Sequence, residues 1–278
     1  MKAKDFLLKN LENDATIYTG YINREAISSI ADAWMNDESN SEHRFEVIRK
    51  FFPEAYTILD MASGCGTCVF YGLLNGYNMY GIDPEKWKHT FNKLKAEEKG
   101  YPVEWLSRFY IGVGEDLPFT DDFFDCCTSY QTLEHVMNPK KCILDMLRIT
   151  KAGGGIHIMC PDYRSTYEGH YNLPWLPLLP RFFAKIYLKA LGRPFKCLNT
   201  IKYVTTNRIL QWLDDISKEK NWHLEIINVN KCKFYNAVKK RNLPIVPGSY
   251  FYYQAFKFLK NLFRNELQTN LVVRIINK

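Results

Sequence analysis

The sequence lacks any run of 18 uninterrupted apolar residues, so we expect no membrane-spanning helix. Its first fourteen residues, MKAKDFLLKNLEND, contain only a three-residue apolar run before Lys9 and lack the long apolar stretch of a secretory signal. Internal repeats and low-complexity tracts are also missing. We therefore expect a cytoplasmic protein, and peripheral contact with the inner membrane surface is the only exception that the sequence suggests.

The eight cysteines are not spaced like a disulfide framework. Cys126 and Cys127 are adjacent, and Cys142 and Cys160 fall in expected regular elements, so we interpret most cysteines as small buried apolar residues. The motif CGTC over residues 65–68 has the C-x-x-C spacing of redox and metal sites. Because it overlaps a glycine-rich turn, we expect neither chemistry there, and the sequence predicts no metal site elsewhere.

Acidic residues are absent from two long stretches, residues 169–213 and 226–265. Residues 1–168 hold 18 Lys and Arg against 25 Asp and Glu, whereas residues 169–278 hold 19 against 5. An acidic body followed by a basic C-terminal third predicts an anionic partner for that third.

The composition, with 46% apolar and 24% charged residues, is typical of a folded globular protein. Short apolar segments alternate with helical patterns, which predicts parallel strand pairing and a doubly wound α/β sheet. Residues 22–50 read as helical, and a Gly153-Gly154-Gly155 break is expected before the fifth strand. Strands are expected at residues 56–61, 78–83, 108–112, 124–130, 156–160, 222–229 and 270–276.

A glycine-rich turn, ILDMASGCGT over residues 58–67, follows the first expected strand. Gly64 and Gly66 have no Cβ, so the backbone there can approach a ligand closely. Asp83 ends the second expected strand, where a carboxylate can accept both hydroxyls of a ribose. Since ligands of open α/β sheets bind beyond the carboxyl ends of the strands, the turn predicts a nucleotide-type ligand.

Two positions around this turn bear on the kind of ligand. A dinucleotide site usually has a third glycine beside the pyrophosphate, and Val69 stands there. Asp60 lies just before the turn, where a carboxylate suits a cationic ammonium better than a pyrophosphate. S-adenosylmethionine (SAM) has an ammonium and no phosphate, so SAM is favoured. A nicotinamide or nucleotide-sugar enzyme on the same fold is the alternative, which NAD binding would identify.

Five segments resemble the motifs of class I SAM-dependent methyltransferases of the small-molecule type, which includes quinone methyltransferases, and they follow one another in the same order as in that family. The resemblance covers residues 56–161, and it implies SAM as the cofactor. It also implies a seven-stranded sheet, parallel with an antiparallel last strand, and the apolar run 270–276 agrees with such a strand. The segments are ILDMASGCGT, YGIDP, GEDLPFTDDFFD, TSYQTLEHV and RITKAGGGIHIMCP.

The resemblance implies roles for residues around the turn. Asp60, Gly64 and Gly66 would contact the methionine part of SAM, and Asp83 would bind its ribose. Ala62 stands where the family usually has glycine, which predicts weaker SAM binding but not its loss.

Two further segments would meet the rest of the cofactor. Gly114 and Glu115 would border the adenine, and Gln131, beyond the fourth strand, would lie near the sulfonium.

The expected parts of the single domain are an N-terminal helical cap (1–52), a SAM-binding core (53–161), and a substrate lid with insertions and the last two strands of the same sheet (162–278).

The segment PDYRSTYEGHY over residues 161–171 follows the fifth strand at the ligand-binding edge and is dense in polar groups. We predict a substrate lid in which His170 acts as the general base, because an ordinary histidine pKa lies near 6.5. Asp162 or Glu168 would orient or replace it. His135, in the run TLEHV, lies at the same edge and is the alternative base, but we interpret it as a structural histidine that orients its loop.

The predicted function is methyl transfer from SAM to a small or lipid-linked acceptor, at oxygen. One alternative is a SAM-binding protein that regulates or acts as a scaffold without turnover. Another is a nucleic-acid methyltransferase, which only the basic C-terminal third supports. The fourth strand is not followed by the Asn/Asp-Pro-Pro-aromatic signature of base methylation, and Cys160-Pro161 has the wrong order and place for pyrimidine methylation.

Two aromatic and basic stretches, residues 174–193 and 250–264, predict contact with an anionic membrane surface. Arg181, Lys185 and Lys189 recur every four positions and would form one stripe on a helix. Basic amphipathic helices with aromatic residues commonly lie in a bilayer interface. The alternative is that both helices only cover the active site, with their apolar faces in the core and their lysines in water.

Overall fold

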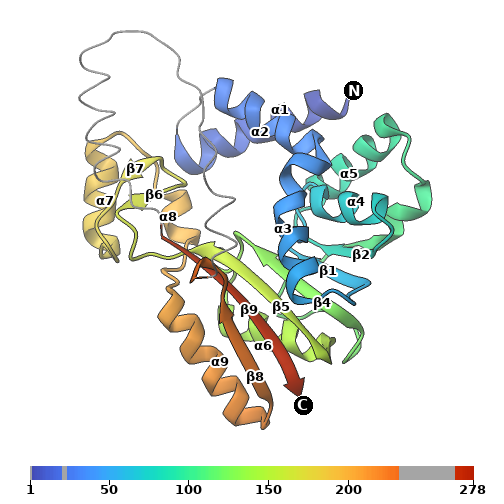
Figure 1. Cartoon of the computed structure of the whole chain (residues 1–278). Helices are drawn as coiled ribbons and strands as arrows, with labels where there is room; N and C mark the ends of the chain where they lie inside the picture. Colours follow the sequence, from blue (N-terminus) through green and yellow to red (C-terminus); the bar gives the residue numbers. More distant parts are fainter. Residues whose placement is uncertain (1, 21–23, 232–266) are drawn as a thin grey trace.

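The computed structural model describes residues 2–20, 24–231 and 267–278 (Figure 1). The strands of the main sheet are β1 Thr57–Met61, β2 Asn78–Ile82, β3 Phe109–Tyr110, β4 Phe124–Tyr130, β5 Thr150–Pro161, β8 His223–Asn228 and β9 Gln268–Asn277. The helices are α1 Ala3–Asp14, α2 Arg24–Met35, α3 Asp37–Phe51, α4 Thr67–Leu74, α5 Lys86–Lys99, α6 Pro139–Ile149, α7 Arg181–Ala190, α8 Lys196–Thr200 and α9 Thr206–Lys220.

The main sheet has seven strands in the order β3-β2-β1-β4-β5-β9-β8. The strands β1 to β5 pair in parallel, whereas β9 is antiparallel to both of its neighbours, β5 and β8. The expected doubly wound sheet with an antiparallel last strand is therefore confirmed.

Both faces of the sheet are covered, so its central strands β1 and β4 are buried along most of their length. Residues of β1, β4 and β5 pack with α6 and α9 in one apolar core, and a second core joins the other face to α3 and α4. The parallel strands end on the side of α1, α2 and a small hairpin formed by β6 Tyr167–Glu168 and β7 Leu173–Pro174 (Figure 1).

Residues 22–50 were expected to be helical, and the structure has two helices in this range, because α2 ends at Met35 and α3 begins at Asp37. The buried Asp37 carboxylate accepts hydrogen bonds from Lys95 on α5 and from the Tyr101 hydroxyl, which fixes the start of α3 against α5.

The three glycines at 153–155 do not break the chain, because all three lie within β5. A Cβ on Gly154 would overlap the carbonyl oxygen of Asp125, and one on Gly155 would overlap that of Val273. Glycine here allows the neighbouring strands to approach closely, and this requirement is not visible in the sequence.

The turn between β1 and α4 places Ala62, Gly64 and Gly66 in the left-handed region, with φ of 61°, 53° and 69°. A Cβ on Gly66 would lie 2.9 Å from both the Asn92 Oδ1 and Phe109 Cε1 atoms, so glycine is required there. Nothing lies within 4 Å of a Cβ placed on Gly64, so this glycine faces open space. Ala62 is the one residue of the three that carries a Cβ in a conformation that favours glycine.

We expect Ala62→Gly to stabilise the protein. Removing the left-handed strain gains roughly 1–2 kcal/mol, and the greater freedom of glycine in the unfolded chain offsets roughly 0.5–1 kcal/mol of this. Thermal unfolding followed by circular dichroism should show a higher melting temperature. The control Ala33→Gly, inside α2, should lower it, because glycine is a poor helix former. An unchanged or lowered melting temperature for Ala62→Gly would contradict the strain at this position.

Asp162 follows β5, and its carboxylate joins two segments of the chain. Its carboxylate accepts hydrogen bonds from the Arg164 backbone N–H at 3.0 Å, from the Arg164 guanidinium Nε at 2.9 Å, and from the Thr206 backbone N–H at 2.9 Å and hydroxyl at 2.8 Å. Burial alone would raise the pKa of Asp162, but these hydrogen bonds outweigh burial and lower the pKa to about 2. The charged carboxylate thus ties the end of β5 to the start of α9.

The depressed pKa makes this contribution to stability depend on pH. The charged form is stabilised relative to the unfolded chain, so the full contribution, about 2 kcal/mol, is present above about pH 4 and is lost as pH falls towards 2. Asp162→Asn removes it at every pH. Urea unfolding should show the wild type more stable by about 2 kcal/mol at pH 7, with a smaller difference at pH 3.

The control for this experiment is Asp214→Asn, because Asp214 pairs with Lys218 on the exposed surface of α9. Its loss should change the free energy of unfolding by less than about 0.5 kcal/mol. A stability difference between wild type and Asp162→Asn that stays constant from pH 7 to pH 3 would show that the carboxylate charge is unimportant.

Candidate active site

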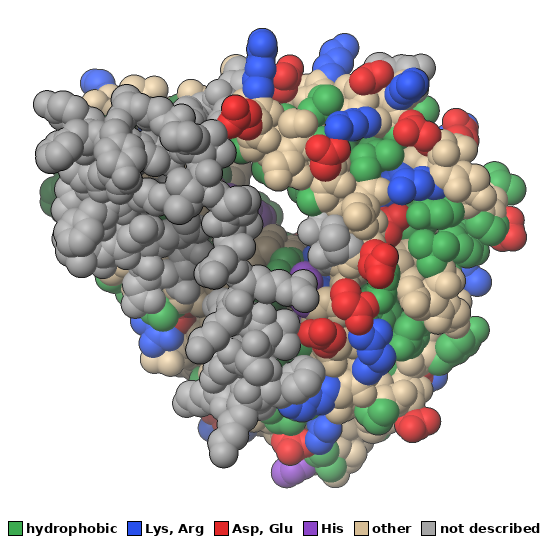
Figure 2. Space-filling model, turned by 45° about the horizontal axis from the view of Figure 1, so that its top comes forward, with side chains coloured by type: hydrophobic (Ala, Val, Ile, Leu, Met, Phe, Trp, Pro, Cys, Tyr) green, Lys and Arg blue, Asp and Glu red, His purple; other side chains and the backbone are tan. Residues whose placement is uncertain are grey.

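The carboxyl edge of the sheet borders a hollow. Figure 2 looks onto this side of the molecule and shows the hollow near the centre of the described surface, with histidine side chains inside it and acidic side chains along one rim. The turn after β1, the end of β2, the loop after β4 and the hairpin β6–β7 supply the predicted site residues that are described below.

Asp83 follows β2, and its side chain is almost fully buried. Its Oδ2 atom accepts a hydrogen bond of 3.1 Å from the Gly64 backbone N–H, and its Oδ1 atom accepts one of 2.9 Å from the Glu85 N–H. The Lys88 ammonium lies 3.3 Å from Asp83 Oδ2. Because a carboxylate offers about four lone pairs, these contacts leave acceptor capacity for a ligand.

Asp60, on β1, is also buried, and its carboxylate faces protein groups. The Arg44 guanidinium, from α3, donates to its oxygens at 3.2 and 3.3 Å, and the Thr128 hydroxyl donates at 3.0 Å. Arg44 also lies 4.0 Å from the centre of the Tyr130 ring. Arg44 was not among the predicted site residues, and Asp60 was expected to face the ligand. The structure instead places Asp60 in an ion pair, and its contact with a ligand stays a prediction.

The surroundings of the turn are suited to a polar ligand such as SAM. Gly64 faces open space, as shown above. Among the described residues, the buried side-chain oxygens without a hydrogen-bond partner include those of Ser63, Asn92 and Ser129. Asn92 donates its amide N–H to the Gly64 carbonyl at 3.3 Å, so its unpartnered oxygen lies next to the turn. Unpaired buried polar atoms are costly, and a polar ligand can satisfy them.

The residues expected around the adenine and the sulfonium also contact other residues of the chain. Gly114 is buried, and a Cβ there would lie 2.6 Å from the Met61 Sδ atom. Glu115 accepts hydrogen bonds from the backbone N–H groups of Met137 at 2.7 Å and Asn138 at 3.0 Å, so it holds the loop before α6. Gln131 is half-buried with φ of 53°, and its N–H donates to the Met159 carbonyl.

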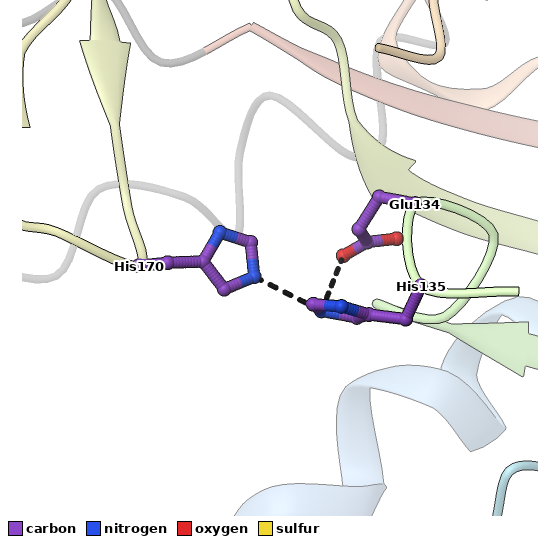
Figure 3. A group of neighbouring side chains, drawn as sticks. All are labelled: Glu134, His135 and His170. Carbon is purple, nitrogen blue, oxygen red and sulfur yellow. Dashed lines mark hydrogen bonds and ion pairs between the residues drawn. The ribbon is translucent and has the colours of Figure 1, made fainter. Parts of the chain in front are cut away.

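The two histidines that the sequence offered as alternative bases lie side by side. The Nε2 atoms of His135 and His170 are 3.0 Å apart, and their rings meet edge to face (Figure 3). His135 Nε2 is also 3.8 Å from the Glu134 Oε1 atom. Glu134 and His135 come from the loop after β4, whereas His170 follows β6 (Figure 3). The fold thus brings two distant segments together at the hollow.

Glu168 orients His170. Its Oε1 atom is 2.6 Å from His170 Nδ1, and its Oε2 atom accepts a hydrogen bond of 2.7 Å from the Tyr171 N–H. Of the two carboxylates expected to serve His170, Glu168 is the one that contacts it. The carboxylate of Asp162 is bound by Arg164 and Thr206 instead, which lower its pKa to about 2, so its role beside His170 stays a prediction.

Burial sets the charge states in this group of side chains. It raises the pKa of Glu134 to about 7 and lowers the pKa of His135 to about 4. Burial also opposes protonation of His170, but the hydrogen bond and the negative charge of Glu168 outweigh it and raise the pKa of His170. Glu134 was not among the predicted site residues, although it directly precedes His135, which was one of them.

Comparison with known proteins finds similarity to methyltransferases. Residues 59–158 match the family described as methyltransferase domain. Over 164 residues the chain is 26% identical to a demethylmenaquinone methyltransferase of Paenarthrobacter aurescens (strain TC1), which covers 57% of this chain and 60% of that protein. A demethylmenaquinone methyltransferase of Renibacterium salmoninarum is 25% identical over 163 residues, covering 57% of this chain and 65% of that protein. The chain thus spans less than two thirds of the length of these relatives.

A solved structure supports the fold. A chain of the complex between the Haloferax volcanii Trm112 methyltransferase activator and a methyltransferase is similar with a TM-score of 0.50 and 15% sequence identity, over 89% of this chain and 97% of that chain. At this identity the similarity concerns the fold alone. The match over residues 59–158, together with the sheet order and the turn after β1, supports a class I SAM-dependent methyltransferase domain in this part of the chain.

Proposed function

We propose that this chain transfers the methyl group of SAM to an oxygen atom of a lipid-linked acceptor. The observation that carries the proposal is the buried Asp83 carboxylate, which holds the open Gly64 turn at the carboxyl edge of the sheet. The names of the two demethylmenaquinone methyltransferase relatives support a quinone or similar lipid as the class of acceptor.

Bound SAM supplies a methyl group on a positively charged sulfur, which is already activated for transfer. The protein then has to align the donor and the acceptor. Asp83 is the residue that would hold the ribose hydroxyls. The ion pair of Asp60 with Arg44 would fix the end of β1, so that the turn keeps its shape. Gln131, which follows β4, would lie near the sulfonium.

An alcohol acceptor must also lose its proton. In the hollow, Glu134, His135 and His170 converge from two segments, and Glu168 fixes the ring of His170. We place the acceptor oxygen at this group of side chains and assign its activation to them, with His170 as the residue on which turnover depends most.

The hairpin that carries Glu168 also borders an apolar cavity, which suits a lipid chain. It has a volume of about 510 Å³, and its lining includes Trp175, Leu176, Leu179, Phe183 and Tyr187. The cavity involves the hairpin β6–β7, because Thr166 lines it directly before β6 and Pro174 lines it from β7. Because the same hairpin carries Glu168 and leads to His170, we place the apolar chain of the acceptor in this cavity.

Helix α7 supports contact with a membrane surface. Its side chains Phe182, Phe183 and Ile186 are 70%, 57% and 53% exposed, and Lys185 and Lys189 are exposed as well. A helix with exposed aromatic and basic residues can lie in a bilayer interface. None of the described helices is both long and apolar enough to cross a membrane.

The predicted basic stripe is smaller than expected. Arg181 is not free, because its guanidinium donates to the carbonyl oxygens of Leu198 and Ile201. It therefore joins α7 to the end of α8, and only the two lysines are available for an anionic surface. The second predicted stretch, residues 250–264, lies outside the described residues.

The first prediction from this proposal concerns cofactor binding. Asp83→Ala and the milder Asp83→Asn remove the charged acceptor for the ribose hydroxyls, which is worth roughly 1.5–3 kcal/mol, so SAM affinity should fall about ten- to a hundredfold. Isothermal titration calorimetry measures this, and Asp214→Ala is the control. Unchanged affinity in both folded Asp83 variants would refute the assignment.

Incubation with methyl-labelled SAM and a lipid extract should yield a labelled lipid, and label found only in water-soluble products would refute the acceptor class.

The second prediction concerns the membrane. The wild type should float with vesicles of phosphatidylcholine and phosphatidylserine at low salt and be released at high salt, because Lys185 and Lys189 each contribute about 1 kcal/mol near an anionic surface. Phe182→Glu combined with Ile186→Glu should abolish flotation. The control, Val103→Glu with Leu74→Glu, changes two exposed apolar side chains elsewhere and should float. A wild type that stays unbound, or a double α7 variant that floats equally well, would contradict the contact.

A further inference from the structure

We propose that Glu134, His135 and His170 bind one Zn²⁺ ion, and that Glu168 holds His170 in the form that binds it. The three side chains belong to one group whose ligand atoms all lie within 4.8 Å of one another. The sequence predicted no metal site, because Glu134 and His135 lie far from His170 along the chain and only the fold brings them together.

The distances suit a small divalent ion. The two Nε2 atoms are 3.0 Å apart, and His135 Nε2 is 3.8 Å from the Glu134 oxygen. Around a tetrahedral zinc ion with bonds of about 2.0–2.1 Å, neighbouring ligand atoms lie about 3.3–3.4 Å apart. The observed distances lie on either side of this value, so small side-chain movements are enough to complete the site (Figure 3).

The Glu134 carboxylate gives independent support. Its side chain is fully buried, and within the described ranges neither oxygen has a hydrogen-bond partner. A buried carboxylate without a partner is costly, whereas a metal ion satisfies it. Glu168 is also buried, and among the residues described neither glutamate pairs with a lysine or an arginine. Metal binding requires a deprotonated Glu134 and neutral histidines, and in that form the two carboxylates carry a charge of −2 that one divalent ion balances.

Glu168 prepares His170 for this role. When the Nδ1–H of His170 donates to Glu168, the lone pair of its Nε2 atom points at His135 and Glu134. Histidines that bind metals usually donate their other ring N–H to a carboxylate in this way, which fixes the tautomer. Glu168 is thus a positioning residue rather than a ligand.

The ligand types distinguish between metals. Two imidazole nitrogens and one carboxylate suit zinc, whereas calcium and magnesium prefer oxygen ligands. Three protein ligands leave a position open, as in catalytic zinc sites. One consequence rests on the proposed function: the open position would take the acceptor hydroxyl. Its proton would pass to solvent, and the oxygen–methyl bond would form as the methyl–sulfur bond of SAM breaks to leave a neutral thioether.

Direct metal binding tests the site without SAM or acceptor. The full chain is freed of metal with a chelator and titrated with Zn²⁺ in competition with a chromophoric chelator. We expect one ion per chain. Glu134→Gln and His170→Asn should each weaken binding more than about 100-fold, and Glu168→Gln about 10- to 100-fold. His223→Asn replaces an exposed histidine on β8 and should bind zinc like the wild type.

The variants also separate this proposal from the proposed function. Circular dichroism identifies any variant that fails to fold, and the remaining ligand variant then decides. Absence of zinc binding in the wild type would overturn the site, as would equal binding in the folded Glu134→Gln or His170→Asn protein. Zinc binding that depends on both residues supports the site even if no methyl transfer is detected, and that second result would count against the proposed function alone.

Discussion

The hydrogen bond from the Gly64 N–H to the Asp83 carboxylate joins the ends of two neighbouring parallel strands. It fixes the turn after β1 against the end of β2, so the open space beside Gly64 and the acceptor oxygens of Asp83 face the same region. The parallel sheet makes this possible, since it places the carboxyl ends of β1, β2 and β4 at one edge. Every other part of the site lies along that edge.

Buried carboxylates recur along this edge, and their partners differ. Asp60 has Arg44 and Thr128, and Asp83 has two backbone N–H groups and Lys88. Glu168 has His170 and the Tyr171 N–H. In the described structure Glu134 alone among them has no hydrogen bond to either oxygen. This contrast separates the groups that hold the site in shape from the group that is available for chemistry.

The sequence predicted the sheet, its antiparallel last strand and the turn after β1, because strand alternation and the glycine pattern are local and belong to a familiar motif. It could not predict the pairing of Arg44 with Asp60 or the meeting of His135 with His170, because such contacts depend on how separate elements pack. The hydrogen bonds of Asp162 were hidden for the same reason, since Thr206 reaches it from a distant helix. Glycines 153–155 looked like a break because the sequence does not show the neighbouring strands.

A crystal structure with S-adenosylhomocysteine, the product of SAM, tests most directly whether this edge binds the cofactor beside the histidines. The structure predicts ribose hydroxyls hydrogen-bonded to Asp83, the amino acid part along the Gly64 turn, and the sulfur facing the hollow that holds His135 and His170. A ligand bound elsewhere, or one whose sulfur faces away from the two histidines, would contradict the assignment of this edge as the site of methyl transfer.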